Sequence, residues 1–417
     1  MKLLLYGLNY APEPTGIGKY TGEMGAWLAG RGHSVDAIVA PPYYPQWEVL
    51  AEYQGKSFVS EDLGGVKVHR APIYVPAPDK VRARTRILHE TSFSATSSRY
   101  WLPRLLRKER YDVVVAVCQP VQIGVYPWLY YKLRGVPFVF HVQDLQVDVA
   151  VNLGMVKDAR LARTLYGIEN SMLRAATRVS TITETMRRRI VEKGIPEERT
   201  WLFPNWSNIR FVRPMSPNNE VRRQFGARPN DVLVLYAGNM GEKQGLDLVL
   251  DAADRLKERD RIKFAMVGAG AAKDRLGRTA EKRGLDKVRF FPLQPLEGLP
   301  AMLAAGDIHL VVQRREAADL VMPSKLTNIL AAGRPSIATA DPNTALYDVL
   351  NEHDCGLTTS PGSVDELVES IIALTDHAET RERLGRNARR YAELYLDKEM
   401  ILTEFESKLQ ELAGIRR

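Results

Sequence analysis

The stretch "MPSKLTNILAAGRPSIATA", residues 322 to 340, places a serine and a lysine at the expected start of a helix. Ser324 follows Pro323, and serine is a favoured N-cap residue, so the pattern predicts a helix that begins there and ends at Gly333. A helix start presents unpaired N–H groups and the positive end of the helix dipole, to which Lys325 adds a full charge. Such a place suits an anion, although a capped helix with a solvated lysine would show the same residues.

A second lysine in the same half of the chain stands near another expected helix start. The loop "NMGEKQG" carries Asn239 and Lys243 into a helix that should begin near Leu246. A cation at this position favours a phosphate, although exposed loop lysines are common. Because two unrelated surface lysines would rarely both meet helix starts in one domain, we interpret Lys243 and Lys325 as two sides of one diphosphate site.

Other residues that could contact a ligand follow predicted strands. Gly16 and Gly18 come after the first strand and Gly268 after a later one, and glycine lets the backbone approach a ligand closely. The two early glycines lack the full spacing of a dinucleotide fingerprint, so NAD binding is not indicated. His141 stands among carboxylates in "HVQDLQVD". A histidine at a strand end is more often structural than catalytic, but the nearby carboxylates bring the two interpretations closer to equal weight. The spacing of these residues matches no strong metal-binding motif.

The elements that must position these residues alternate between strands and helices. In the first half, β-rich runs that predict strands cover residues 2–10, 34–42, 66–73, 111–119, 137–144 and 178–183. In the second half they cover residues 231–239, 262–270, 287–293, 308–313 and 336–340. Strands that alternate with helices indicate parallel sheets covered on both faces. We therefore predict an α/β protein of two doubly wound, Rossmann-like domains that face each other across a cleft, with ligands at the carboxyl ends of the strands.

The domain boundary is expected in residues 201–219, where Pro, Asn and Ser collect and the periodicity fades. We predict an N-terminal domain over 1–205 and a C-terminal domain over 206–390. The remaining segment, 391–417, is strongly helical and could pack back on the first domain. At 417 residues, the chain is long enough for two domains of this size.

The formal charge of +8 and a pI of about 9.3 indicate a polyanionic partner. The charge is concentrated in residues 80–110, with nine Lys or Arg against two Glu and with Phe93, Tyr100 and Trp101 interleaved. Such a stretch would lie well on an anionic membrane surface, with its aromatic rings in the interface, although a solvated basic helix is the alternative. No nucleic-acid-binding motif accompanies the charge, so nucleic acid is not an expected partner.

The remaining composition suggests a cytoplasmic protein, and the basic stretch would let it bind peripherally to the inner face of the cytoplasmic membrane. No segment resembles a signal peptide, and the most apolar stretch, residues 111–131, contains Asp, Gln and Pro residues that a membrane span would avoid. Cys118 and Cys355 lie far apart in apolar surroundings, which predicts buried free thiols and not a disulfide framework.

Several motifs together resemble one known family. The segments "AGNMGEKQGLDLVLDAADRL", "AMVGAGAAKDRL", "MPSKLTNILAAGRPSIA" and "STITETMRRRIVEKGI", with "FPN" after it, are similar to the retaining nucleotide-sugar glycosyltransferases of family four, which have the GT-B fold. More narrowly, "YAPEPTGIGKYT", "FHVQDLQVDVA", "FPNW" and "GNMGEKQG" resemble the transferases of colanic-acid and related exopolysaccharide synthesis. The resemblance runs from about residue 1 to residue 400.

The resemblance implies a role for each candidate residue. Lys243, Ser324 and Lys325 would hold the donor's diphosphate, with the Gly16 to Gly18 loop closing over it, and His141 would lie near the reacting sugar. The implied reaction moves a sugar from a nucleoside-diphosphate sugar to a glycan acceptor, with retention. The acceptor we expect is linked to a polyprenyl diphosphate.

Three positions depart from the family's pattern. Asn239 stands where the family usually has Arg, and Lys243 comes one place earlier than the family's Lys. Asn328 replaces a Glu that typically holds the nucleotide ribose, and the spacing from Glu316 to Asn328 does not fit the family's Glu pair. An Asn can still hydrogen-bond two hydroxyls, but without charge.

Mechanism and alternatives follow from the same residues. The chain contains no Asp-x-Asp motif, and cations with helix N–H groups could stabilise the departing diphosphate, so we expect neither metal nor other cofactor. The alternatives are a nucleotide-sugar epimerase, a transferase that uses a soluble acceptor, and a non-catalytic protein that binds sugar nucleotides; the departures favour the last of these.

Overall fold

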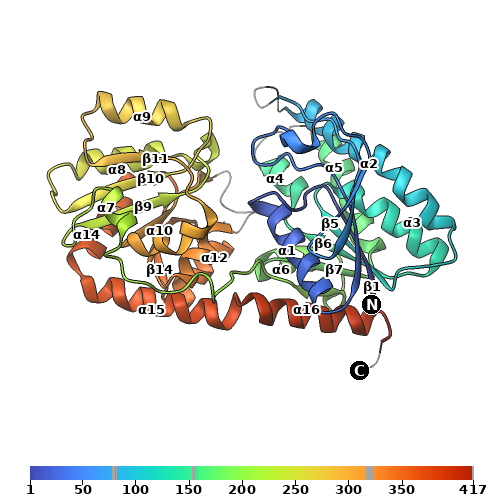
Figure 1. Cartoon of the computed structure of the whole chain (residues 1–417). Coiled ribbons are helices and arrows are strands. Elements are labelled where there is room, and N and C mark those ends of the chain that lie inside the picture. Colours follow the sequence, from blue (N-terminus) through green and yellow to red (C-terminus); the bar gives the residue numbers. More distant parts are fainter. Residues whose placement is uncertain (78–79, 81, 153–155, 157, 316–323, 416–417) are drawn as a thin grey trace. The chain divides into compact units, whose positions relative to one another are not determined.

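The computed structural model describes the chain except for residues 78–79, 81, 153–155, 157, 316–323 and 416–417. The chain forms two compact units, which Figure 1 shows coloured along the sequence. Unit 1 consists of Met1–Pro204 together with Ile401–Arg417, and unit 2 consists of Asn205–Met400.

Unit 1 is built on a sheet whose described strands run in the spatial order β3-β4-β2-β1-β5-β6-β7-β8. The strands are β1 (Lys2–Gly7), β2 (Ser34–Val39), β3 (Val59–Leu63), β4 (Val66–Arg70), β5 (Val113–Cys118), β6 (Phe138–Val142), β7 (Arg178–Thr181) and β8 (Thr200–Leu202). All neighbouring pairs are parallel except β3 with β4, which is antiparallel. The central strands are continuous apolar runs because a parallel sheet is buried on both faces.

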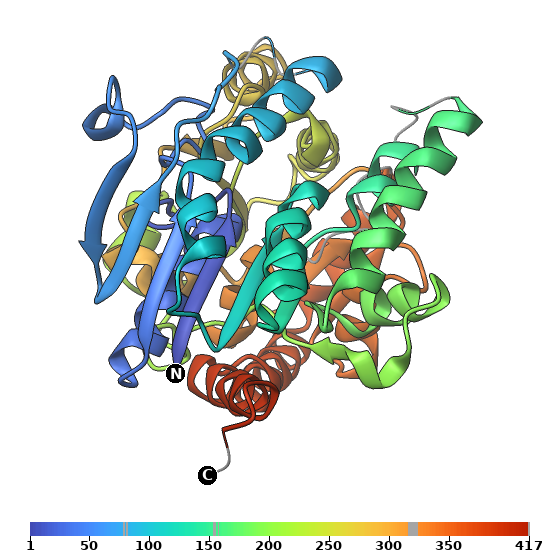
Figure 2. The same cartoon turned by 90° about the vertical axis from the view of Figure 1, so that its right-hand side faces the viewer.

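Helices cover both faces of this sheet. Those of unit 1 are α1 (Gly16–Gly30), α2 (Ala83–Leu106), α3 (Val125–Arg134), α4 (Gln146–Asn152), α5 (Ala159–Ala175) and α6 (Glu184–Glu192), with short 3₁₀ turns η1 (Ala51–Tyr53), η3 (Val121–Gly124) and η4 (Glu197–Arg199). Figure 2 shows α2, α3 and α5 on the face of the sheet that is turned toward the viewer. Polar side chains begin two of these helices: the carboxylate of Asp158 accepts from N–H groups at the start of α5, and the hydroxyl of Thr183 does so for α6.

Unit 2 contains a second parallel sheet, with the strand order β11-β10-β9-β12-β13-β14 among the described residues. Its strands are β9 (Val232–Ala237), β10 (Ile262–Val267), β11 (Val288–Phe291), β12 (Ile308–Val311), β13 (Ser336–Thr339) and β14 (Gly356–Thr359). Its helices are α7 (Glu220–Gln224), α8 (Asp247–Arg255), α9 (Lys273–Lys282), α10 (Leu299–Ala305), α12 (Ser324–Ala331), α13 (Ala345–Glu352), α14 (Val364–Asp376) and α15 (Ala378–Tyr395), with 3₁₀ turns η5 (Glu242–Gln244) and η6 (Leu296–Gly298).

The structure confirms the predicted fold class, two doubly wound Rossmann-like α/β units. The sequence missed three strands, β3, β8 and β14. Each lies at an edge of its sheet and is short or alternates with polar residues, so it lacks the continuous apolar run of a central strand. The predicted buried free thiols, Cys118 and Cys355, are confirmed, and burial raises the pKa of both.

Strand order places ligand-binding loops at one point in each unit. In unit 1 the direction in which successive strands are added to the sheet reverses at β1, which has β2 on one side and β5 on the other. In unit 2 it turns at β9, which lies between β10 and β12. Ligands of open α/β sheets bind beyond the carboxyl ends of the strands at such a switch point. The loops after β1, β2, β5 and β6, and those after β9, β10 and β12, are therefore the places where functional side chains are expected.

The last helix, α16 (Lys398–Leu412), completes unit 1. The ring of Phe405 stacks on that of Phe203, with ring centroids 3.8 Å apart. The buried carboxylate of Glu406 accepts from Arg31 at 3.1 Å and lies 2.7 Å from Nε2 of His33. These contacts join the end of the chain to segments far away in the sequence.

Replacement of the stacked ring tests how much this helix stabilises unit 1. Phe405→Ala should lower the free energy of unfolding by about 3–5 kcal/mol, because it removes a fully buried aromatic side chain and leaves a cavity. Chemical denaturation followed by circular dichroism measures the change. Thr403→Ala, at an exposed position of the same helix, is the matched control and should stay within about 0.5 kcal/mol. A small loss for Phe405→Ala would show that α16 is not required for unit 1.

Candidate active site

Lys325 lies in the first turn of α12, which begins at Ser324 as the sequence predicted. Its Nζ atom stands 4.0 Å from the centre of the ring of Tyr236, the fifth residue of β9. It also lies beside the turn after β9, since a Cβ atom on Gly238 would come 3.5 Å from it. The packing of α12 therefore places a cation at the carboxyl end of the central strand of unit 2.

The amine of Lys325 is buried, and it has no hydrogen-bond partner among the residues that the structure describes. Burial disfavours the ammonium form and lowers the pKa of Lys325 from 10.5 to about 7. The ring of Tyr236 gives only a cation–π contact, worth about 1–2 kcal/mol, which is less than the cost of dehydrating an ammonium group. An anionic ligand would supply the missing partner.

The turns after β9 and β10 pack tightly beside this lysine. A Cβ atom on Gly268 would lie 1.9 Å from the carbonyl oxygen of Gly238, and Gly268 has a φ of +151°, so only glycine fits there. The hydroxyl of Tyr236 donates to the carbonyl oxygen of Asn239 at 2.6 Å and fixes the start of the next loop. The structure thus brings together three residues that the sequence singled out, Asn239, Gly268 and Lys325.

Three further candidates are described only in part or not at all. Lys243 lies on η5, directly before α8, but its side chain lies outside the described part of the structure. The same holds for the side chain of Ser324, whose backbone opens α12. Glu316 lies outside the described residues.

Asn328, one turn after Lys325 on α12, has a partner within unit 2. Its Oδ1 atom accepts from the hydroxyl of Ser207 at 2.8 Å. Ser207 in turn pairs through its backbone with Leu396 and Lys398. In this structure the side chain therefore fastens α12 to the segment around Ser207, and its predicted contact with a ribose stays a prediction.

In unit 1, the loop after β1 is organised by a carboxyl group that the sequence analysis did not single out. Glu13 is buried, and its Oε1 atom accepts from the backbone N–H groups of Tyr43 and Tyr44, both at 3.1 Å. Burial, partly offset by these N–H groups, raises the pKa of Glu13 to about 7. A Cβ atom on Gly18 would lie 2.2 Å from Oε2 of Glu13, and Gly16 has a φ of +63° at the start of α1. Both predicted glycines thus serve the local packing of this loop.

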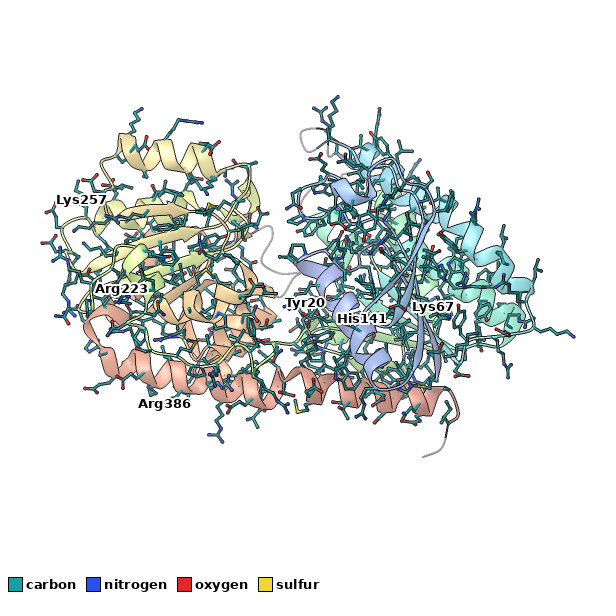
Figure 3. All side chains as sticks on the ribbon, viewed as in Figure 1. Tyr20, Lys67, His141, Arg223, Lys257 and Arg386 are labelled. Atoms are coloured by element: carbon teal, nitrogen blue, oxygen red, sulfur yellow. The ribbon has the colours of Figure 1, made fainter. Side chains whose placement is uncertain are left out.

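His141 lies within β6 and is almost fully buried (Figure 3). The side-chain amide of Gln143 donates to its Nε2 atom at 2.8 Å, which leaves the proton on Nδ1 to be donated to the hydroxyl of Ser180, 2.9 Å away. Burial lowers the pKa of His141 to about 3, so the ring stays neutral. Both nitrogens are engaged inside unit 1, and the predicted contact of His141 with a reacting sugar stays a prediction.

The described residues contain no group of three or more His, Cys, Asp or Glu side chains arranged to hold a metal ion. Among the helices in this part of the chain, none is both long enough and apolar enough to cross a membrane.

Comparison with known proteins identifies the class to which this fold and site belong. Residues 15–206 match the glycosyl transferase 4-like domain, and residues 217–391 match the glycosyl transferases group 1 domain. The chain belongs to the two-domain glycosyltransferases of family four, which have the GT-B fold. It is 42% identical over 416 residues to the "Putative colanic acid biosynthesis glycosyl transferase WcaI" of Escherichia coli (strain K12), with 97% of this chain and 98% of the relative covered.

Solved structures agree with this fold. A sucrose-phosphate synthase from Thermosynechococcus elongatus superposes with a TM-score of 0.75 at 17% identity, covering 100% of both chains. HepE from Anabaena, solved in complex with UDP, gives a TM-score of 0.73 at 14% identity, covering 99% of this chain and 100% of HepE. At these identities the likeness concerns the fold alone.

The buried amine of Lys325 makes the stability of the protein depend on pH in a defined direction. Between pH 7 and 10.5 the unfolded chain holds a proton on this lysine that the folded chain has lost, so wild-type stability rises with pH through that window. Lys325→Met should therefore be more stable than wild type below pH 7, by on the order of a few kcal/mol, and this gain should shrink toward pH 10.5.

Denaturant unfolding of ligand-free protein at several pH values measures this gain. Lys257→Met, which removes an exposed lysine of unit 2 (Figure 3), is the control, and the effect is taken as the difference between the two variants. A gain that does not change with pH would show that the amine of Lys325 is not held in the buried state described above.

Proposed function

We propose that this protein transfers a sugar from a nucleoside-diphosphate sugar to a glycan acceptor in the synthesis of a bacterial cell-surface polysaccharide of the colanic-acid type. The observation that carries the proposal is the buried amine of Lys325 at the carboxyl end of β9, for which the described part of unit 2 supplies no hydrogen-bond partner. The relative from Escherichia coli has a name that refers to colanic acid, and HepE has been solved with UDP and with UDP-glucose, which supports a donor of this class.

In the proposed mechanism, unit 2 stabilises the negative charge that grows on the diphosphate as the bond to the sugar breaks. Lys325 and the N-terminal N–H groups of α12 would contact the phosphate oxygens, and Lys243 would add a second cation from η5. Preorganised donors of this kind are worth about 3–4 kcal/mol each in other enzymes. We further propose that no metal ion takes part, that the configuration at the sugar is retained, and that the departing diphosphate accepts the proton of the acceptor hydroxyl.

Nucleotide binding tests the diphosphate site directly. Thermal unfolding with UDP, GDP, ADP or dTDP should show stabilisation by at least one of them, with or without magnesium, because a ligand that binds only the folded state stabilises it. Lys325→Met should weaken that binding by about 10- to 100-fold, the value of a hydrogen bond to a charged group. Lys243→Glu should abolish turnover while the protein stays folded.

The exposed Lys257→Met variant is the matched control and should bind the nucleotide as wild type does. If none of the four nucleotides stabilised the wild-type protein, or if Lys325→Met bound as tightly, the diphosphate site would have to be abandoned.

We propose that the acceptor is linked to a polyprenyl diphosphate and that unit 1 binds the anionic inner face of the cytoplasmic membrane through α2 and α3, which contact each other. Along α2 the exposed apolar side chains are Ile87, Leu88, Leu102 and Leu106, and along α3 they are Val125, Trp128, Tyr131 and Leu133. Exposed basic residues accompany them at positions 84, 107, 108 and 110. Apolar side chains among cations are typical of helices that lie in the headgroup region of anionic lipid.

One part of the sequence prediction for this surface is wrong. Phe93 and Trp101, expected in the membrane interface, are fully buried and pack around Tyr6 of β1. Tyr100 packs on Phe58. These rings lie on the face of α2 that covers the sheet, so the apolar contribution to a membrane surface would come from the leucines and the isoleucine on the opposite face.

Vesicle sedimentation tests this surface. The double variant Leu102→Ser with Leu106→Ser should bind vesicles of phosphatidylglycerol and phosphatidylethanolamine about tenfold more weakly than wild type, because it removes two apolar anchors. Binding should also fall with added salt and be weak on pure phosphatidylcholine. Leu394→Ser, an exposed leucine of unit 2, is the control. Equal binding by the double variant and wild type would contradict the surface.

A further inference from the structure

A cavity of about 350 Å³ lies in unit 2 between the end of α13, the turn that leads into β14, and the second half of α15. We call it the α13/α15 cavity. It stands at the amino end of β14, whereas Lys325 lies at the carboxyl end of β9 in the same parallel sheet. Its volume is within the range of pockets that hold a small molecule. The function proposed above makes no use of this cavity.

Three aromatic rings line the α13/α15 cavity. The ring centroid of His353 lies 4.7 Å from that of Tyr391 and 5.4 Å from that of Tyr395, and the centroids of the two tyrosine rings are 4.9 Å apart. Tyr391 packs against the buried core of unit 2, which holds its ring in place, and Tyr395 is 47% exposed. A ligand in the cavity would therefore meet aromatic faces that are already in position.

Hydrogen bonds fix the turn between α13 and β14 that forms another side of the cavity. Asp354 has a φ of 45°, in the left-handed region that aspartate tolerates better than most residues. The side-chain amide of Asn387 donates to the carbonyl oxygen of Asp354 and to its Oδ2 atom, both at 2.9 Å. Arg383 forms an ion pair with the same carboxylate. The cavity is thus formed without a ligand, which lowers the cost of binding one.

The exposed charges at the cavity are of both signs. Glu352 and Arg390 line it, and the carboxylate of Glu352 lies within electrostatic reach of the hydroxyl of Tyr391. The carboxylate of Asp354 is already paired with Arg383. One carboxylate and one guanidinium group therefore balance each other. A phosphate would be repelled by Glu352 and an organic cation by Arg390, so neither kind of ion is the preferred ligand.

An uncharged saccharide has the chemistry that this combination of groups recognises. The C–H groups on the face of a sugar ring carry a small positive charge and pack well on the negative face of an aromatic ring. Hydroxyl groups both donate and accept hydrogen bonds, so they can pair with a carboxylate and a guanidinium group at the same site. A sugar can therefore use the rings, Glu352 and Arg390 together.

We infer that the α13/α15 cavity binds a saccharide, whose ring packs on Tyr391 and Tyr395 and whose hydroxyl groups contact Glu352 and Arg390. The cavity and the candidate donor site lie at opposite edges of one sheet, so the occupant of the cavity is not the sugar that is being transferred. It is a unit of the glycan that the enzyme extends, and this last assignment rests on the proposed transferase function.

NMR of full-length protein with labelled tyrosine rings tests the inference. Tyr391→Phe and Tyr395→Phe assign the two ring resonances by their loss. The probes are the methyl glycosides of glucose, galactose, fucose and N-acetylglucosamine at millimolar concentration, with inorganic diphosphate and tetramethylammonium as charged comparisons. At least one glycoside should shift both resonances, and neither ion should. Tyr131, an exposed tyrosine of α3 in unit 1, is the internal control.

Affinities from the same titration, followed at the ring of Tyr391, separate the contacts. Tyr395→Ala removes an exposed ring and should weaken glycoside binding about three- to tenfold, whereas Tyr395→Phe keeps the ring and should bind nearly as wild type does. Arg390→Ala should weaken binding about tenfold, because it removes a hydrogen bond from a charged group. Arg386→Ala, one turn earlier on α15 and outside the cavity, is the matched control (Figure 3).

Glu352→Gln distinguishes a saccharide from a cation as the ligand. The variant loses the negative charge but keeps an acceptor oxygen, so glycoside binding should fall by less than about threefold. A cation would depend on the charge and would be lost. A shift caused only by tetramethylammonium or only by diphosphate would overturn the saccharide site, and so would the absence of a shift with every probe.

The outcomes separate this inference from the proposed function. Tyr395→Ala should leave the thermal stabilisation by a nucleotide unchanged, because the cavity and Lys325 lie at opposite edges of the sheet. Stabilisation by a nucleotide without any glycoside shift would overturn the saccharide site and leave the donor site intact. A glycoside shift without stabilisation by any nucleotide would support the saccharide site and remove the transferase proposal.

Discussion

The candidate donor site in unit 2 depends on one constraint, the burial of a lysine amine that has no hydrogen-bond partner among the residues the structure describes. A buried ammonium group loses several kcal/mol of hydration, and the aromatic ring of Tyr236 returns only a part of this. The turn at Gly238 lies beside the amine, since a Cβ atom there would come 3.5 Å from it. Unit 2 thus keeps the amine of Lys325 buried at a cost in free energy. An anionic ligand would remove this cost, and the free energy regained would add to the affinity for the ligand.

The two units differ in the chemistry that they present at equivalent edges of their sheets. Unit 2 offers a cation at the start of a helix, where charge can be stabilised. Unit 1 presents carboxyl groups, amides and aromatic rings around a buried histidine. Two units of one architecture can present such different groups because the loops after their strands differ in sequence.

The sequence predicted the architecture well because its signals are local. Apolar runs such as "VVVAVC", and the helix starts at Ser324 and near Leu246, depend on neighbours within a few residues. Contacts between residues far apart in the chain could not be predicted from the sequence. Glu13 acquires its role from N–H groups about thirty residues away, and the rings that contact His89 precede it by more than forty residues. The face of α2 that carries Trp101 was assigned wrongly, because only the sheet decides which face is buried.

The C-terminal helix shows how the order of the chain constrains both units. Phe405 and Glu406 contact Phe203, Arg31 and His33, and His33 in turn lies 3.1 Å from the N-terminal amine of Met1. The contacts between α16 and the rest of unit 1 can therefore form only after the whole of unit 2 has been synthesised. The cost of closing a loop of this length grows only slowly with the number of residues. The backbone of Ser207 pairs with Leu396 and Lys398, so the folded unit 2 holds its two ends together and shortens the effective loop that the contacts of Phe405 and Glu406 must close.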